Sequence, residues 1–133
     1  MKSLRSLLVA TSILALGIAA AEFPPLAGAE QMYPDVIAVK VRARAASTFE
    51  FDVTVSSPYD TPQRYADGIR AVSKDGAVLG QRKLFHDHSL EQPFTRPLRV
   101  VLVPPEVRVV IIQARDQKHG YGGKTVEVAL PGR

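Results

Sequence analysis

The strongest constraint on the fold is a strict alternation of apolar and polar residues between positions 49 and 56. Phe49, Phe51, Val53 and Val55 occupy the odd positions, and every residue between them is polar or charged. Successive side chains of a β-strand point to opposite faces of the sheet, so the pattern predicts a strand with one buried face. The chain is therefore expected to build its core from strands.

Six further segments are also predicted to be strands, and turn signals separate them. They span residues 37–44, 65–73, 77–84, 98–103, 107–115 and 124–130. Asp75-Gly76 is a hairpin signal, and ten prolines and nine glycines favour many tight turns. Together they predict an all-β fold, a two-sheet antiparallel sandwich of about seven strands of immunoglobulin or fibronectin-like type. A small closed barrel is the alternative.

The periodicity also predicts which side chains face the core. In the 107–115 strand an almost continuous apolar run indicates burial on both faces, with Val109 and Ile111 expected between the sheets together with Phe51 and Val53. In the first strand the alternation places Ile37, Val39, Val41 and Ala43 on one buried face.

The beginning of the chain has the composition of an export signal. Lys2 and Arg5 precede an uncharged apolar run, and Ala27-Gly28-Ala29 fits the small-x-small cleavage rule, with cleavage after Ala21 as the alternative. The run is short for a bilayer span of roughly 20 residues. We expect a signal peptide at 1–29, one domain at 30–133, a periplasmic or secreted location, and no stable membrane anchor.

Composition excludes several classes of function. The chain contains no cysteine, so disulfides, thiolate metal sites, cysteine nucleophiles and lipid attachment to an N-terminal cysteine are all excluded. The formal net charge is +4, and the basic residues are spread along the chain rather than clustered. Nucleic acid is therefore not an expected partner.

The three longest irregular connections are expected to share one end of the sandwich. Successive connections alternate between the two ends, so residues 57–63, 85–97 and 116–123 should converge. These segments include all three histidines. Loops held together on a rigid scaffold commonly carry binding residues.

The histidines are candidate metal ligands. His86 and His88 are two residues apart, so on extended backbone both side chains point to the same side. His119 could supply a third nitrogen for zinc or copper, with Asp87, Glu91 or Asp116 as an oxygen ligand or an orienting partner. The alternative is that the histidines are ordinary loop residues.

Charged residues at the same end suggest a site for a small anion. Arg96, Arg115, Lys118 and Lys124 flank it, and the glycine-rich turn at 120–123 could direct N–H groups into it. Alternatively, Arg96 pairs with Glu91 or Asp116 and only fastens the loop. The predicted binding residues are Glu91, Arg96, Asp116, Lys118 and Tyr121.

Catalysis is not favoured. Ser89 lies beside His88, but side chains adjacent in sequence usually diverge, and the chain has no Gly-x-Ser-x-Gly elbow. Glu91 and Asp116 are a candidate carboxylate pair, but two acids within loops are more often hydrogen-bond acceptors.

Several blocks of the sequence carry a resemblance to a known group of proteins. His86-x-His88, the Glu-Gln-Pro-Phe-Thr-Arg block at 91–96 and the His-Gly-Tyr-Gly-Gly-Lys-Thr block at 119–125 resemble small exported proteobacterial proteins of uncharacterised function. The resemblance implies a single exported domain and assigns no activity.

We therefore expect a non-catalytic binding module whose partner is an envelope protein or a small anionic ligand. A metal-binding protein or metal-dependent enzyme that uses the three histidines, and a purely structural envelope protein, are the alternatives.

Overall fold

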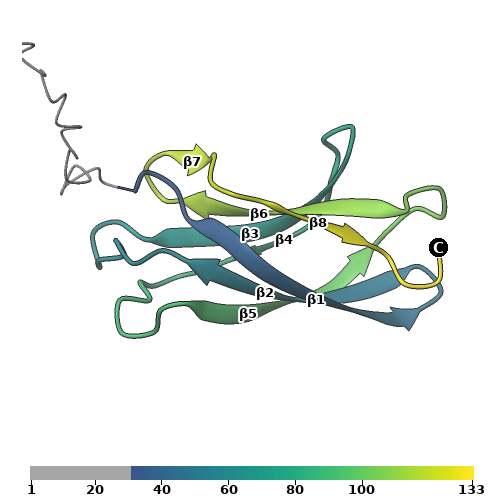
Figure 1. Ribbon diagram of the computed structural model, residues 1–133, viewed down its shortest axis with the longest axis horizontal. Helices are drawn as coiled ribbons and strands as arrows, with labels where there is room; N and C mark the ends of the chain where they lie inside the picture. Colours follow the sequence, from purple (N-terminus) through teal and green to yellow (C-terminus); the bar gives the residue numbers. More distant parts are fainter. Residues whose placement is uncertain (1–30) are drawn as a thin grey trace, which may run out of the picture.

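The computed structural model describes residues 31–133 as two antiparallel β-sheets packed face to face (Figure 1). The predicted signal peptide lies outside the described residues. No helix in the described part of the chain is long and apolar enough to cross a membrane. The strands are β1 (Asp35–Ala45), β2 (Thr48–Ser56), β3 (Ala66–Ser73), β4 (Val78–Lys83), β5 (Phe94–Leu102), β6 (Val109–Asp116), β7 (Gly120–Tyr121) and β8 (Val126–Ala129).

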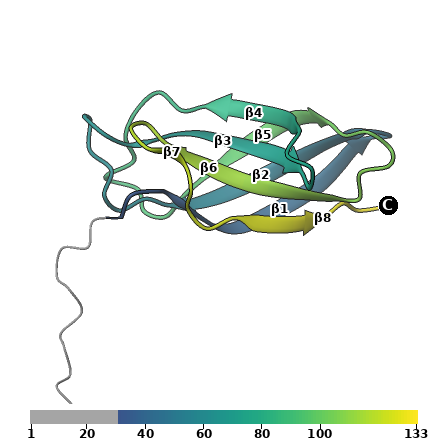
Figure 2. The same ribbon diagram turned by 90° about the horizontal axis from the view of Figure 1, so that it is seen from above.

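The strand order confirms the predicted two-sheet sandwich. One sheet has the order β1-β2-β5. The other has the order β4-β3-β6, with both β7 and β8 pairing to β6. Figure 1 shows the two sheets as separate layers, and in Figure 2, which is turned by 90°, one sheet lies over the other.

The core lies between the sheets and follows the alternation of β2. Phe51, Val53 and Val55 are completely buried, as the sequence predicted. On β6 the register differs from the prediction by one residue, because Val110 and Ile112 are completely buried while Val109 and Ile111 are only half-buried. Four consecutive apolar residues leave the inward face undefined in the sequence, and a shift of one residue exchanges the two faces of a strand.

A bulge in β1 also changes which of its side chains are buried. The pairing of β1 with β2 shifts between Val36 and Ala38, so Ile37 falls out of register. As a result Val36 is buried, whereas Ile37 is 50% exposed, contrary to the expected inward position. Bulges insert one extra residue and thereby reverse the apparent alternation.

The strands next to the predicted site differ from the prediction in two ways. β5 begins at Phe94, four residues before the predicted start, so the connection before it is shorter than expected. β7 was not predicted, and it pairs Tyr121 with Arg115 at the end of β6. Both differences occur beside the predicted site and decide where its residues lie.

Candidate functional site

The β2–β3, β4–β5 and β6–β7 connections converge at one end of the sandwich, as the sequence predicted (Figure 1). We call this region the loop end, comprising residues 57–65, 84–93 and 117–119. Two contacts between connections illustrate the convergence. The amide N–H of Ser57 donates to the Gln92 side chain at 2.8 Å, and the N–H of Gln117 donates to the Tyr65 carbonyl at 3.0 Å.

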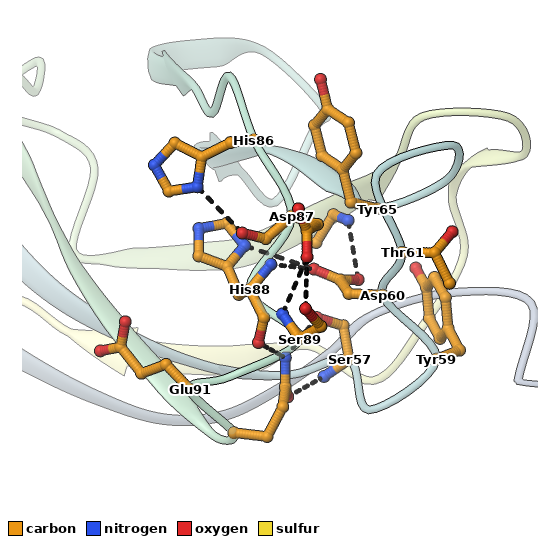
Figure 3. A network of polar contacts seen from close by, with 12 residues as sticks. Ser57, Tyr59, Asp60, Thr61, Tyr65, His86, Asp87, His88, Ser89 and Glu91 are labelled. Carbon is orange, nitrogen blue, oxygen red and sulfur yellow. Dashed lines mark hydrogen bonds and ion pairs between the residues drawn. The ribbon is translucent and has the colours of Figure 1, made fainter.

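Asp60 joins the β2–β3 connection to the β4–β5 connection (Figure 3). The residue is 4% exposed, and its side chain is completely buried. One oxygen accepts the N–H of Ala66 at 3.1 Å, and the other accepts the N–H of His88 at 3.1 Å and lies 3.3 Å from the His88 ring nitrogen Nδ1. A single buried carboxylate therefore satisfies backbone groups from two segments.

The His88 ring is held through one of its faces and one of its edges. Its ring stacks on Phe94, with 3.7 Å between centroids and 11° between planes, and only 3% of the residue is exposed. Burial lowers the pKa of His88, an effect that the hydrogen bond with Asp60 opposes and the Arg96 charge reinforces. The ring is thus neutral at pH 7, with its proton on Nδ1 facing Asp60 and Nε2 as the remaining acceptor.

Asp116 joins the β6–β7 connection to the β2–β3 connection. It is completely buried. Its carboxylate accepts the Tyr59 hydroxyl at 2.7 Å, the Arg64 Nε–H at 3.2 Å, and the N–H groups of Lys118 and His119 at 2.9 and 2.7 Å. Burial by itself raises the pKa of Asp116, but these donors outweigh it, and the pKa lies below its usual value.

The segment that enters β1 crosses the glycines of the 119–125 block. A Cβ on Gly122 would lie 2.6 Å from the Tyr33 ring, and one on Gly123 would lie 2.0 Å from the Pro34 carbonyl oxygen. The N–H of Lys124 donates to Asp35 at 2.8 Å. These two glycines therefore allow a close approach of two backbones, which is a structural reason for the glycine-rich block.

The five predicted binding residues do not form one site. Glu91 and Arg96 form an exposed two-bonded ion pair at 2.8 and 3.2 Å, the structural pairing that was one of the two expectations for Arg96. The buried Asp116 carboxylate is already used to hold the loops. Lys118 is exposed beside it, whereas Tyr121 lies on the outward face of the second sheet, under the Arg70 guanidinium at 3.6 Å.

The structure brings two of the three histidines together. The rings of His86 and His88 lie 5.1 Å apart between centroids, whereas the His119 ring packs edge-on against Tyr33 at 6.1 Å. Across residues 31–133 there is no group of three or more histidine, aspartate or glutamate side chains placed to hold a metal ion. The expected three-histidine centre is not assembled by these side chains.

The β4–β5 connection also exposes two large apolar side chains that the sequence analysis did not select. Leu90 is 102% exposed and Phe85 is 75% exposed. The signal in the sequence was the presence of these two large apolar residues in a mostly polar loop. Asp60 was also missed, because one aspartate in a proline-containing loop resembles any other turn residue.

The comparisons with known proteins give one relative. The chain is 35% identical over 94 residues to a protein of Halomicrobium mukohataei described as "Putative lipoprotein". The match covers 71% of this chain but only 46% of that protein, so the chain spans about half the length of the relative. No protein-family model and no solved structure matches the chain.

Proposed function

We propose that this chain is an exported, non-catalytic binding module that contacts a protein of the cell envelope through its loop end. The observation that carries the proposal is the display of Phe85 and Leu90 on a connection that is otherwise fastened to the sandwich. An exposed apolar surface that is rimmed by polar groups is typical of an interaction site. Because the loop is already ordered, binding costs less conformational entropy than it would for a free loop.

Side-chain hydrogen bonds fasten the β4–β5 connection to the rest of the loop end. Asp60 holds the backbone of His88, and the Gln92 side chain bonds both to Ser57 and to the His88 carbonyl, the latter at 3.1 Å. Leu90 lies between these two held positions. The polar groups around it, His86 and the Glu91–Arg96 ion pair, would supply the rim of a contact surface.

Two observations support an exported location. The first 29 residues have the composition of a cleavable export signal, and the relative is described as a lipoprotein. Lipid attachment is not part of the proposal, because none of the 133 residues is a cysteine. Catalysis is not part of it either, because the buried carboxylates of Asp60 and Asp116 are occupied by the donors that hold the loops.

Site-specific photo-crosslinking in cells tests this function. A photoreactive phenylalanine analogue placed at position 90, and separately at position 85, is expected to give the same discrete protein adduct. The matched control is position 78, where Val78 is 48% exposed at the opposite end of the sandwich. Leu90→Asp should abolish the adduct from position 85. Equal labelling from positions 78 and 90 would refute a contact at the loop end.

Binding of zinc or copper is the second candidate function, and the histidine pair favours it. The His86 Nδ1 lies 2.9 Å from the Asp87 carbonyl, and the His88 Nδ1 faces Asp60, so both Nε2 atoms are left to accept a ligand. Titration calorimetry with zinc would test it. Loss of binding in His86→Ala, with His119→Ala unchanged, would identify a site made by the adjacent pair alone.

A further inference from the structure

A hollow on the outward face of the second sheet is lined by residues that do not belong to the loop end. Its volume is about 340 Å³, and it is lined by Asp67, Gly68, Gln81, Arg82, Lys83, Arg115 and Tyr121. Gly68 pairs with Lys83 on one side and with Arg115 on the other, so these three residues form a row across the sheet. The hollow therefore lies between two cationic side chains, over a position without a side chain.

The backbone does not require glycine at position 68. Gly68 is not among the residues with positive φ. A Cβ there would meet its nearest neighbours at 3.5 Å or more, which is ordinary van der Waals contact. Glycine at this position leaves space in front of the sheet, and that space is what a ligand would use.

Asp67 enters the hollow because of a bulge. The pairing of β3 with β6 shifts between Ala66 and Gly68, which places Asp67 beside Arg115, and the two side chains form an ion pair. The other carboxylate oxygen, Oδ1, is shielded and has no hydrogen-bond partner among residues 31–133. Buried acceptors are nearly always paired, so this oxygen is an exception in the wall of the hollow.

Of the remaining polar groups of the hollow, Arg82 donates to the Pro97 carbonyl at 2.7 Å, and the others are uncommitted. Within the described part of the chain, the Gln81 amide and the Tyr121 hydroxyl make no hydrogen bond, and the Lys83 ammonium has only a contact with the Phe85 ring at 5.7 Å. The Tyr121 ring is held in place by Arg70, which itself donates to Gln113 at 2.7 Å. Burial raises the pKa of Tyr121, so its hydroxyl keeps its proton and can donate.

We infer that this hollow binds an acidic sugar, a hexuronate, with its carboxylate toward Lys83 and Arg115 and its hydroxyls toward Asp67, Gln81 and Tyr121. Three cationic residues, Arg82, Lys83 and Arg115, against the one carboxylate of Asp67 favour an anionic ligand. Several neutral donors and acceptors around a rigid aromatic ring suit a polyhydroxylated ligand. The inference does not depend on the loop end, which lies on other residues.

The probes are sodium glucuronate, glucose and sodium acetate, titrated into the purified chain and followed by amide chemical shifts. Glucuronate should bind saturably and at least tenfold more tightly than glucose or acetate. Gly68→Val fills the hollow and should abolish binding, and Lys83→Gln should weaken it about tenfold. The matched control Lys74→Gln, in the turn at the far end, should bind as the wild type does, and so should Leu90→Asp.

Three outcomes would overturn the inference. Acetate binding as tightly as glucuronate would show a nonspecific anion site. Glucose binding as tightly as glucuronate would show that Lys83 and Arg115 do not contribute to recognition. Unchanged glucuronate binding in both Gly68→Val and Lys83→Gln, each with a wild-type thermal unfolding curve, would place the ligand elsewhere.

Discussion

Replacing Asp60 by alanine removes the acceptor for two buried backbone groups at once. The N–H groups of Ala66 and His88 each lose a hydrogen bond of 3.1 Å, and both residues are almost inaccessible to solvent. Each buried donor left unsatisfied costs about 1–3 kcal/mol. Asp60→Ala should therefore lower the free energy of unfolding by about 2–6 kcal/mol, a large share of the roughly 5–15 kcal/mol typical of a domain.

Urea denaturation followed by far-ultraviolet circular dichroism measures this loss. Asp60→Asn keeps one acceptor oxygen and should lose about half as much. The control is Asp87→Ala, because Asp87 accepts from Ser89 at the exposed surface, and this variant should leave the denaturation midpoint nearly unchanged. If Asp60→Ala and Asp87→Ala were equally stable, water would be replacing the carboxylate, and the argument that Asp60 fastens the loop end would fail.

Three further predictions concern the core, the entry segment and pH. Phe51→Ala empties a completely buried position and should cost about 3–5 kcal/mol in unfolding free energy, and an unmoved denaturation midpoint would contradict the packing of β2. Gly123→Ala forces the backbone at Pro34 to move and should cost about 1–3 kcal/mol in the same assay, whereas Gly68→Ala, with ordinary contacts only, should be nearly neutral. Because the folded pKa of His88 lies below the unfolded value of about 6.5, the unfolded chain takes up the proton first, so His88 should reduce stability as pH falls below about 6.5. The titratable and charged groups that face His88 are Asp60, Arg96 and His86. Between pH 7 and pH 5 the melting temperature of His88→Asn should fall less steeply with pH than that of the wild type. An equally steep fall in both proteins would assign the effect to other groups.

The fold was predictable where one face of a strand is apolar and the other polar. β2 lies within one residue of its predicted start because Phe49, Phe51 and Val53 leave no ambiguity about the inward face. The prediction failed at Val109 and Ile111, because an unbroken apolar run contains no information about register. It failed at Ile37 because the bulge that reverses the alternation depends on pairing with β2, which is a tertiary contact.

The convergence of the three connections was also predictable, because it follows from strand order alone. The roles of individual residues within it were not. Asp116 was expected to face a ligand, but two of its donors are Tyr59 and Arg64, more than fifty residues earlier in the chain. A sequence pattern can bring loops to one end, but it cannot show which carboxylates are consumed in holding them there.

The positions at which the chain enters and leaves the sandwich have a mechanical consequence. Residue 31 lies at the loop end and Arg133 at the opposite end (Figure 1). A tension applied between these points would pull β1 and β8 in opposite directions along their own lengths. The hydrogen bonds that pair β1 with β2 and β8 with β6 would then be loaded in shear and would resist together. The hydrogen bond from the Val36 N–H to the Lys124 carbonyl would resist with them. Under such a tension the two ladders would resist as units and would not open strand by strand.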